Sequence, residues 1–302
     1  MAFTIAHITD PHLGPLPTPR LRDLTLKRAM GFVNWKRGRE GLNDMAMLGR
    51  LVADLKANAP DHVAMTGDIV NIALPAEFAP AVRWMRGLGD PHDVSFTPGN
   101  HDAYVASALP QLAEAFAPWT SSDPAFAEGP RFPFVRLRDG LALIGLNSGA
   151  PTGPLMATGR LGAAQCATLA GLLERFGRED RARVILIHHP PLASGQAYLR
   201  RLTDAAPFER VVRRFGAELI LHGHNHRRMT NAWTSPAANT PGGRIAILGA
   251  PSASSTARHQ LERAAYHLVA LARDAGLWRI SARARGLLAD SAEIGELAPL
   301  PI

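Results

Sequence analysis

The 302-residue sequence predicts an α/β fold, and three of its features support this. Short apolar runs typical of strands alternate with segments that have the apolar spacing of amphipathic helices. This alternation continues to residue 226 and favours βαβ units around a largely parallel sheet. Residues 243–285 instead hold strand-like runs without an intervening helix, which predicts a second, partly antiparallel sheet. The length suffices for one large domain, so we expect a single domain over residues 1–302.

The expected elements follow in chain order, each from its own pattern. Strands that end in polar loops are expected at 3–10, 61–68, 92–102, 141–148, 182–191 and 217–226. Amphipathic helices are expected at 43–58, 76–89, 161–177 and 208–216. Asn43 is the expected N-cap of the first of these helices, and Gly89 closes the second. The C-terminal strands are expected at 243–250 and in a hairpin over 265–285 that turns at 273–276.

Composition narrows the functional classes. The formal charge is +7, but all except three of the basic residues are arginines, which indicates a compositional bias, so we expect no nucleic-acid partner. The chain has no apolar run of about eighteen residues and no signal-peptide pattern at its start, so no membrane-spanning helix or leader is expected. The one cysteine, Cys166, lies in a helical pattern, excludes an intrachain disulfide and fits a cytoplasmic location.

Metal-binding residue types follow the predicted strands. In an open α/β sheet, the loops at the carboxyl ends of the strands gather at one edge, where ligands bind. Five such strand ends carry aspartate, asparagine and histidine, which are nitrogen and oxygen donors for first-row transition metals. These candidates are Asp10, His12, Asp68, Asn100, His101, Asp102, His188, His189, His222, His224 and His226. The sequence therefore predicts a metal site at this edge.

Two spacings indicate how pairs of these residues share an ion. Asp10 and His12 are two positions apart, so both side chains point to one side of an extended backbone. His222 and His224 have the same spacing, and the glycine between them lets the chain approach an ion closely. The set holds more ligands than one ion takes, so we expect two ions with a carboxylate such as Asp68 between them. His226 fits the edge of a substrate site and open solvent equally well.

The motifs DPHLG, GDIVN, GNHD, HHPP and GHNH occur in this order from Asp10 onwards and cover most of the chain. Together they resemble the calcineurin-like binuclear metallophosphoesterase family. The resemblance implies a four-layer α/β/β/α sandwich with two mixed sheets. It also implies two metal sites that share Asp68, namely Asp10, His12, Asp68 and His224 in one, and Asp68, Asn100, His188 and His222 in the other.

The resemblance further implies a reaction. Two divalent or mixed-valence ions of manganese, iron, zinc or cobalt would share a bridging hydroxide that attacks the phosphorus of a phosphoester. His101 would contact the substrate phosphate or protonate the leaving group, and Asp102 would orient His101. Asn100 and His226 would face the substrate, whereas His189 would have a structural role. The expected reaction is therefore hydrolysis of a small-molecule phosphodiester.

Two alternatives stay open. The first is a pyrophosphate-cleaving hydrolase of UDP-2,3-diacylglucosamine, which acts in lipid A synthesis at the membrane surface. The chain resembles such hydrolases in its early basic insertion and in the motifs GNHDAY and LHGHNH. A non-catalytic scaffold would keep the fold without the activity. The intact set of candidate ligands favours an enzyme over the scaffold.

Segment 15–42 is a basic insertion that bears on this choice. On a helical wheel Arg28 intrudes on an apolar face made by Leu21, Leu24, Phe32 and Trp35. We expect either a lid helix packed on the core, or a flap that holds a lipid-linked substrate or rests peripherally on the inner face of a membrane. The tail at about 289–302 is expected to be loosely held.

Overall fold

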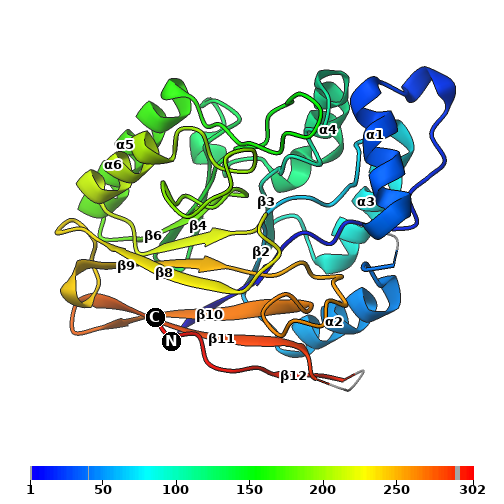
Figure 1. The fold of residues 1–302 in the computed structure, drawn as a ribbon. Coiled ribbons are helices and arrows are strands. Elements are labelled where there is room, and N and C mark those ends of the chain that lie inside the picture. Colours follow the sequence, from blue (N-terminus) through cyan, green and yellow to red (C-terminus); the bar gives the residue numbers. More distant parts are fainter. Residues whose placement is uncertain (1, 40, 290–292) are drawn as a thin grey trace.

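The computed structural model describes residues 2–39, 41–289 and 293–302, and its strands form two mixed sheets (Figure 1). The first sheet contains β1 (Phe3–Ile8), β2 (His62–Met65), β3 (Val94–Phe96), β10 (Ala265–Asp274), β11 (Leu277–Leu287) and β12 (Ile294–Glu296). Its order is β12-β11-β10-β1-β2-β3. β1, β2 and β3 run parallel, whereas the β10–β11 hairpin and β12 continue the sheet with antiparallel strands on the other side of β1.

The second sheet has a parallel centre and antiparallel edges. It contains β4 (Phe134–Arg138), β5 (Leu141–Gly145), β6 (Ala182–Leu186), β7 (Leu219–His222), β8 (Met229–Thr234) and β9 (Arg244–Gly249), in the order β4-β5-β6-β7-β9-β8. β5, β6, β7 and β9 are parallel, and β4 and β8 flank them antiparallel. Every residue of β5, β6 and β7 is buried, because both faces of a parallel sheet are covered.

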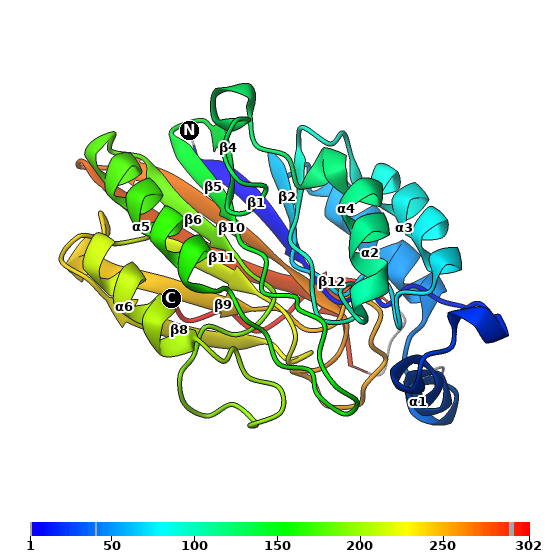
Figure 2. The ribbon, with the colours of Figure 1, turned by 90° about the horizontal axis from the view of Figure 1, so that it is seen from above.

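Helices cover the outer faces of both sheets. The covering helices are α2 (Met45–Ala57), α3 (Pro75–Leu88), α4 (Leu109–Ala115), α5 (Ala163–Arg178) and α6 (Ala205–Phe215), whereas α1 (Leu26–Asn34) lies apart from both sheets. Seen from above, α5 and α6 lie on one side of the paired sheets, and α2, α3 and α4 lie on the other (Figure 2). This confirms the four-layer α/β/β/α arrangement. Among the described residues, no helix combines the length and the apolar character that crossing a membrane requires.

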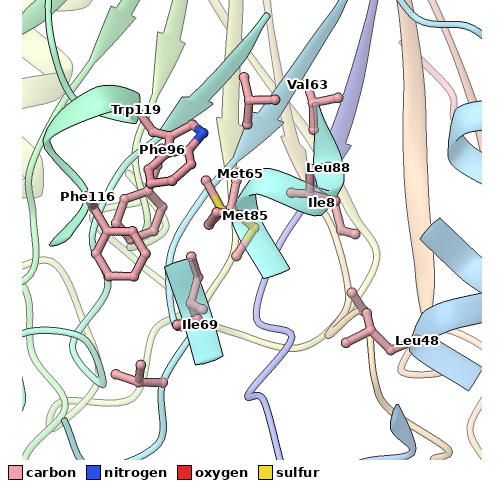
Figure 3. Packing of buried hydrophobic residues seen from close by; sticks show 14 of the residues in the cluster. Ile8, Leu48, Val63, Met65, Ile69, Met85, Leu88, Phe96, Phe116 and Trp119 are labelled. Atoms are coloured by element: carbon pink, nitrogen blue, oxygen red, sulfur yellow. The ribbon is translucent and has the colours of Figure 1, made fainter. Parts of the chain in front are cut away.

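Apolar side chains fill each interface between layers. Under α3, Met85 joins Met65 of β2 and Phe96 of β3 in one cluster, which continues through the rings of Phe116 and Trp119 (Figure 3). Between the two sheets, the cluster consists of alternate strand residues, including Ile5, Leu143, Leu221 and Val269. Under α5 and α6, the third cluster includes Leu173, Ile185 and Phe208. The sheets are therefore rigid supports for the loops at their carboxyl ends.

Three details of the sequence-based expectations need correction. The C-terminal strands divide between the sheets, because β9 pairs parallel with β7 while the β10–β11 hairpin takes the free edge of β1. The N-cap of α2 is Asp44, not Asn43, because the Asp44 carboxylate accepts from the N–H groups of Ala46 and Met47 at 2.8 and 3.0 Å. The described part of the tail is held, since β12 pairs with β11 and Leu300 is buried.

Segment 15–42 forms a cap, and its helical part is shorter than the wheel implied. Leu21 belongs to a separate 3-10 turn and is exposed, whereas Phe32 and Trp35 pack against Ile72 and Leu74. Arg28 does not intrude on this packing. Its buried guanidinium donates to backbone carbonyl oxygens of the segments at 23 and 72–73, so it fastens the cap to the loop after β2.

Candidate metal centre

The predicted metal-binding residues lie together at the carboxyl ends of five strands. The loops after β1 and β2 run side by side, since the N–H of Asp10 donates to the carbonyl oxygen of Gly67 at 3.0 Å and that of His12 to Asp68 at 3.1 Å. The loops after β6 and β7 are joined in the same way, through Gly223 N–H and the carbonyl oxygen of His188 at 3.0 Å. Both sheets therefore present their ligands to one place.

One group of potential ligands consists of Asp10, His12 and His226. His226 Nε2 lies 3.1 Å from Asp10 Oδ1 and 3.1 Å from His12 Nε2. His12 Nε2 lies 3.9 Å from the same aspartate oxygen. One atom of each residue therefore lies within 4.8 Å of the others, which is close enough for all three to bind one ion.

A second group surrounds His188. His188 Nε2 lies 3.3 Å from Asp68 Oδ2 and 3.3 Å from Asn100 Oδ1. The Nδ1 atom of His224 approaches the same nitrogen to 3.2 Å. Asp10, Asp68 and His188 also form a group with ligand atoms within 4.8 Å, so the two groups adjoin at the buried aspartates.

The structure places His226, not His222, among the ligand groups. His222 is the last residue of β7, and its ring packs against Gly249 of β9 while Nδ1 faces the carbonyl oxygen of Gly223 at 3.1 Å. The expected pairing of His222 with His224 assumed a continuous strand. The chain instead turns after His222, so His224 takes the position beside His188 and His226 the position beside His12.

Backbone strain is concentrated at these ligands. Positive φ angles occur at Asp10 (50°), His12 (41°), Asp68 (55°), His224 (71°) and His226 (50°). Such angles are uncommon for residues with a side chain and cost roughly 1 kcal/mol or more each. The surrounding hydrogen bonds must impose them, and strain of this kind clusters at functional sites.

Two glycines make room for the ligands. At Gly67, with φ at 94°, an added Cβ atom would collide with His188 Nδ1, and at Gly223 it would collide with the side chains of Thr9 and Asp10. The loop after β2 and the turn after β7 therefore approach the centre more closely than any other residue allows.

Neighbouring oxygens, which the sequence patterns did not reveal, orient the ligands. The backbone carbonyl oxygen of Thr66 accepts from His188 Nδ1 at 2.7 Å, which leaves Nε2 of that ring facing Asp68 and Asn100. Thr9 Oγ1 donates to Asp10 Oδ2 at 2.7 Å, and Ser252 Oγ donates to the Asp10 carbonyl oxygen at 2.6 Å. Such partners fix the tautomer and direction of ligating side chains. Serine and threonine are too common beside loops to signal this role in sequence.

The electrostatics of the site fit two cations. Burial opposes ionisation of Asp10, but His226, His188 and His12 outweigh it and hold the pKa of Asp10 well below its usual range. Burial likewise opposes a charge on His188, yet Asp68 and Asp10 raise its pKa to about 9. Among the described residues, these buried carboxylates are paired only with histidines. Oxygen and imidazole donors around two buried anions suit first-row dications, which would replace the imidazolium protons.

His101 and Asp102 have different surroundings from those expected. The His101 ring donates through Nδ1 to the carbonyl oxygen of Asn71, and its backbone N–H donates to Asp68 Oδ1 at 2.7 Å. His101 thus joins His12 and Asp68 in a further group of close ligand atoms. Asp102 instead accepts from four backbone N–H groups of the loops after β2 and β3. Asp102 therefore shapes the loops, and Asn71 orients the His101 ring.

His189 forms a further group of close ligand atoms with His188 and His224, but its ring nitrogens also contact a loop. Its Nδ1 atom lies 2.8 Å from Ser148 Oγ, and its Nε2 atom lies 3.2 Å from the carbonyl oxygen of Ala157. Burial, followed by the neighbouring His224 and His188, holds its pKa well below the usual range. Both ring nitrogens therefore have partners within the protein.

A cavity of about 330 Å³ opens beside the candidate ligands. Asp68, Asn100, His101, His224 and His226 line its floor. Its walls include Lys27 and Trp35 of the cap, Tyr104, and Arg200, which lie outside the five metal-site motifs. Lys27 Nζ donates to the Tyr104 carbonyl oxygen at 2.8 Å and lies over the Tyr104 ring, and burial lowers its pKa to about 8. The cavity is therefore lined both by potential metal ligands and by the ammonium group of Lys27, which these contacts keep in place.

The family of the chain follows from a match to a family model. The model described as calcineurin-like phosphoesterase matches residues 3–228, which is most of the chain. The chain belongs to this family. The resemblance that the five motifs predicted is therefore confirmed, and with it an assignment to phosphoesterase hydrolases.

Individual relatives share this assignment. The chain is 27% identical over 231 residues to a probable cyclic nucleotide phosphodiesterase from Synechococcus, and the match covers 75% of this chain and 74% of that protein. Among solved structures, a dimetal phosphatase from Danio rerio superposes with a TM-score of 0.64 at 13% identity, covering 95% of this chain and 97% of that one. A purple acid phosphatase from yellow lupin gives 0.55 at 10% identity, over 98% and 53%. At these identities the solved structures show the fold alone.

Proposed function

We propose that the protein is a metal-dependent phosphodiesterase with two metal sites that meet at Asp10 and Asp68. One site consists of Asp10, His12 and His226, and the other of Asp68, Asn100, His188 and His224. The observation that carries the proposal is that two ligand groups adjoin at two buried carboxylates, one of which, Asp68, lines a cavity. The name of the Synechococcus relative, a probable cyclic nucleotide phosphodiesterase, supports the diester as substrate.

The metals would supply an activated water near neutral pH and would neutralise charge on the phosphate oxygens. The protein's own groups do the rest. Lys27 and Arg200, which both line the cavity, attract the anionic phosphate. His101, whose Nδ1 proton is held by the Asn71 carbonyl oxygen, presents Nε2 to the centre. In its protonated form that nitrogen donates a proton to the departing alkoxide.

The shape of the cavity favours a diester over a monoester. Its floor holds the candidate ligands, and its walls extend along Met30 and Trp35 of the cap and along Met156. A phosphate bound at the floor leaves this extension for the ester group that is not released. A cavity of about 330 Å³ is at the small end of sites for organic ligands.

Hydrolysis of bis-p-nitrophenyl phosphate by the manganese-loaded protein tests the proposal. We expect turnover by the wild type. With a diester whose leaving group is an alkoxide, His101→Ala should lose roughly a hundredfold or more, because such a group needs a proton to depart and removal of a general acid typically costs this much. Bound manganese should stay unchanged in that variant. His92→Ala is the matched control, since His92 is an exposed histidine outside the centre, and it should retain full activity.

Three results would contradict the proposal. Full activity in His101→Ala would remove the role of His101. Inertness of the metal-loaded protein towards mono-, di- and pyrophosphate esters would instead support the non-catalytic scaffold. Preferential turnover of a pyrophosphate would favour the pyrophosphate-cleaving alternative.

We propose a cytoplasmic location for the activity, on the basis of the single Cys166.

A further inference from the structure

Exposed apolar side chains are concentrated in three segments that also line or adjoin the cavity. Among the large apolar residues that are exposed in the described part of the chain, all except Leu277 belong to segments 21–42, 155–156 and 198–199. The most exposed are Leu21 (89%), Leu26 (73%), Leu155 (72%) and Tyr198 (71%). We call these four residues the apolar rim. A single exposed leucine needs no explanation, but a concentration of this kind marks a surface that contacts something apolar.

The three segments border the same cavity. Met30 and Trp35 of the cap, Leu155 and Met156 of the loop after β5, and Arg200 of the loop after β6 all line it. Hydrogen bonds connect the segments, from Lys27 Nζ to Thr152 Oγ1 at 2.9 Å and from Ala157 N–H to the Leu199 carbonyl oxygen at 2.8 Å. Figure 2 shows α1 and these two loops along one edge of the molecule.

Positive charge accompanies the apolar rim. Segment 15–42 contains seven lysines and arginines against Asp23 and Glu40. The loop segments 149–160 and 190–203 contain arginines and no acidic residue. The side chains of Arg20, Arg22, Arg37 and Arg200 are exposed. Apolar side chains between exposed arginines are complementary to a lipid surface, where the apolar groups enter the boundary of the acyl chains and the arginines meet phosphate groups.

We propose that the apolar rim docks the protein onto an anionic lipid surface, with the mouth of the cavity towards the lipid. The inference rests on the proposed function in one respect, because it assigns the substrate to phosphoesters whose organic part is anchored in that surface. The apolar lining of the cavity includes Met30, Leu155 and Met156, and Leu155 belongs to both the lining and the rim. An anchored ester can therefore reach the candidate ligands without leaving the lipid.

Vesicle binding of the full chain tests the docking. Sedimentation with phosphatidylcholine vesicles, with and without phosphatidylglycerol, is measured in EDTA so that no turnover contributes. We expect binding to the anionic vesicles, and a fall of roughly tenfold or more in the partition coefficient of the double variant Leu21→Ser, Leu26→Ser. Leu277→Ser is the matched control, because Leu277 is exposed at the start of β11, outside the three segments, and it should bind as the wild type does.

Three results would overturn the docking proposal. The first is unchanged vesicle binding by the double variant, and the second is equal binding of the wild type to neutral and anionic vesicles. The third is a wild type that binds no vesicles but self-associates in solution, with the double variant abolishing the self-association. Leu21 and Leu26 do not line the cavity, so the double variant should hydrolyse bis-p-nitrophenyl phosphate at the wild-type rate. Failure of the proposed function would therefore appear as absent turnover with vesicle binding intact, and failure of docking as the reverse.

Discussion

Replacing Asp102 with asparagine should weaken the loops that hold both Asp68 and Asn100. The Asp102 carboxylate is fully buried and accepts from the backbone N–H groups of Asp68 (2.7 Å), Ile69 (2.9 Å), Val70 (3.2 Å) and Gly99 (2.8 Å). Each carboxylate oxygen serves two of these donors. An asparagine presents an NH₂ group at one of the two positions, whichever way its amide is turned.

The expected loss of stability follows from the number of hydrogen bonds that the substitution removes. Two buried N–H groups lose their acceptor in Asp102→Asn and face another donor. An unsatisfied buried donor costs about 1–3 kcal/mol, so the free energy of unfolding should fall by about 2–6 kcal/mol. Burial, and then Asp68, raise the pKa of Asp102 to about 7, so the comparison is made above pH 7, where the wild-type carboxyl is ionised.

Urea unfolding in EDTA measures this loss without any contribution from bound metal. Asp274→Asn is the matched control, since Asp274 pairs with Arg279 on the surface, and it should cost less than about 1 kcal/mol. Calorimetric titration with manganese should show weaker binding to Asp102→Asn. A cost equal to that of the control, together with unchanged manganese affinity, would refute the account of Asp102 as the residue that shapes both loops.

Three further predictions concern the ligands and the cavity. His226→Ala should lower the manganese content of the protein, whereas His222→Ala should retain it, and elemental analysis of the two variants decides between these residues. Gly67→Ala should displace the His188 ring and reduce manganese affinity roughly tenfold or more. Gly242 also has a positive φ but faces open space, so Gly242→Ala should leave manganese affinity unchanged. Equal losses of affinity in the two variants would mean that backbone strain alone, and not the collision with His188, is the cause. Burial lowers the pKa of Lys27 to about 8, so the Lys27 side chain becomes neutral above that pH. KM for a diester should therefore rise above pH 8 in the wild type and stay constant in Lys27→Arg. A KM of the wild type that does not change with pH would show that Lys27 does not contact substrate.

The strand ends could be located from the sequence because apolar runs stop abruptly before polar loops. Asp10, Asp68 and Asn100 follow β1, β2 and β3 directly, and parallel strands must present their carboxyl ends at one edge. The same reasoning placed His188 after β6. These positions depend only on the period of the strands and on the direction of the chain.

The residues beyond a turn could not be predicted in this way. His226 reaches the centre only because the backbone adopts positive φ angles at His224 and His226, and a period-two pattern contains no information about such a turn. Arg28 appeared to interrupt an apolar face, but its guanidinium is buried against backbone oxygens that only the folded loop provides. The edge strand β8 was missed because most of its residues are only partly buried and its apolar pattern is weak.

Anomalous diffraction from crystals of the manganese-loaded protein would locate the bound metal ions. We expect two peaks of anomalous density, one between Asp10, His12 and His226, and the other between Asp68, His188 and His224. A single peak, or a peak beside His222 instead of His226, would show that the proposed pair of metal sites is wrong.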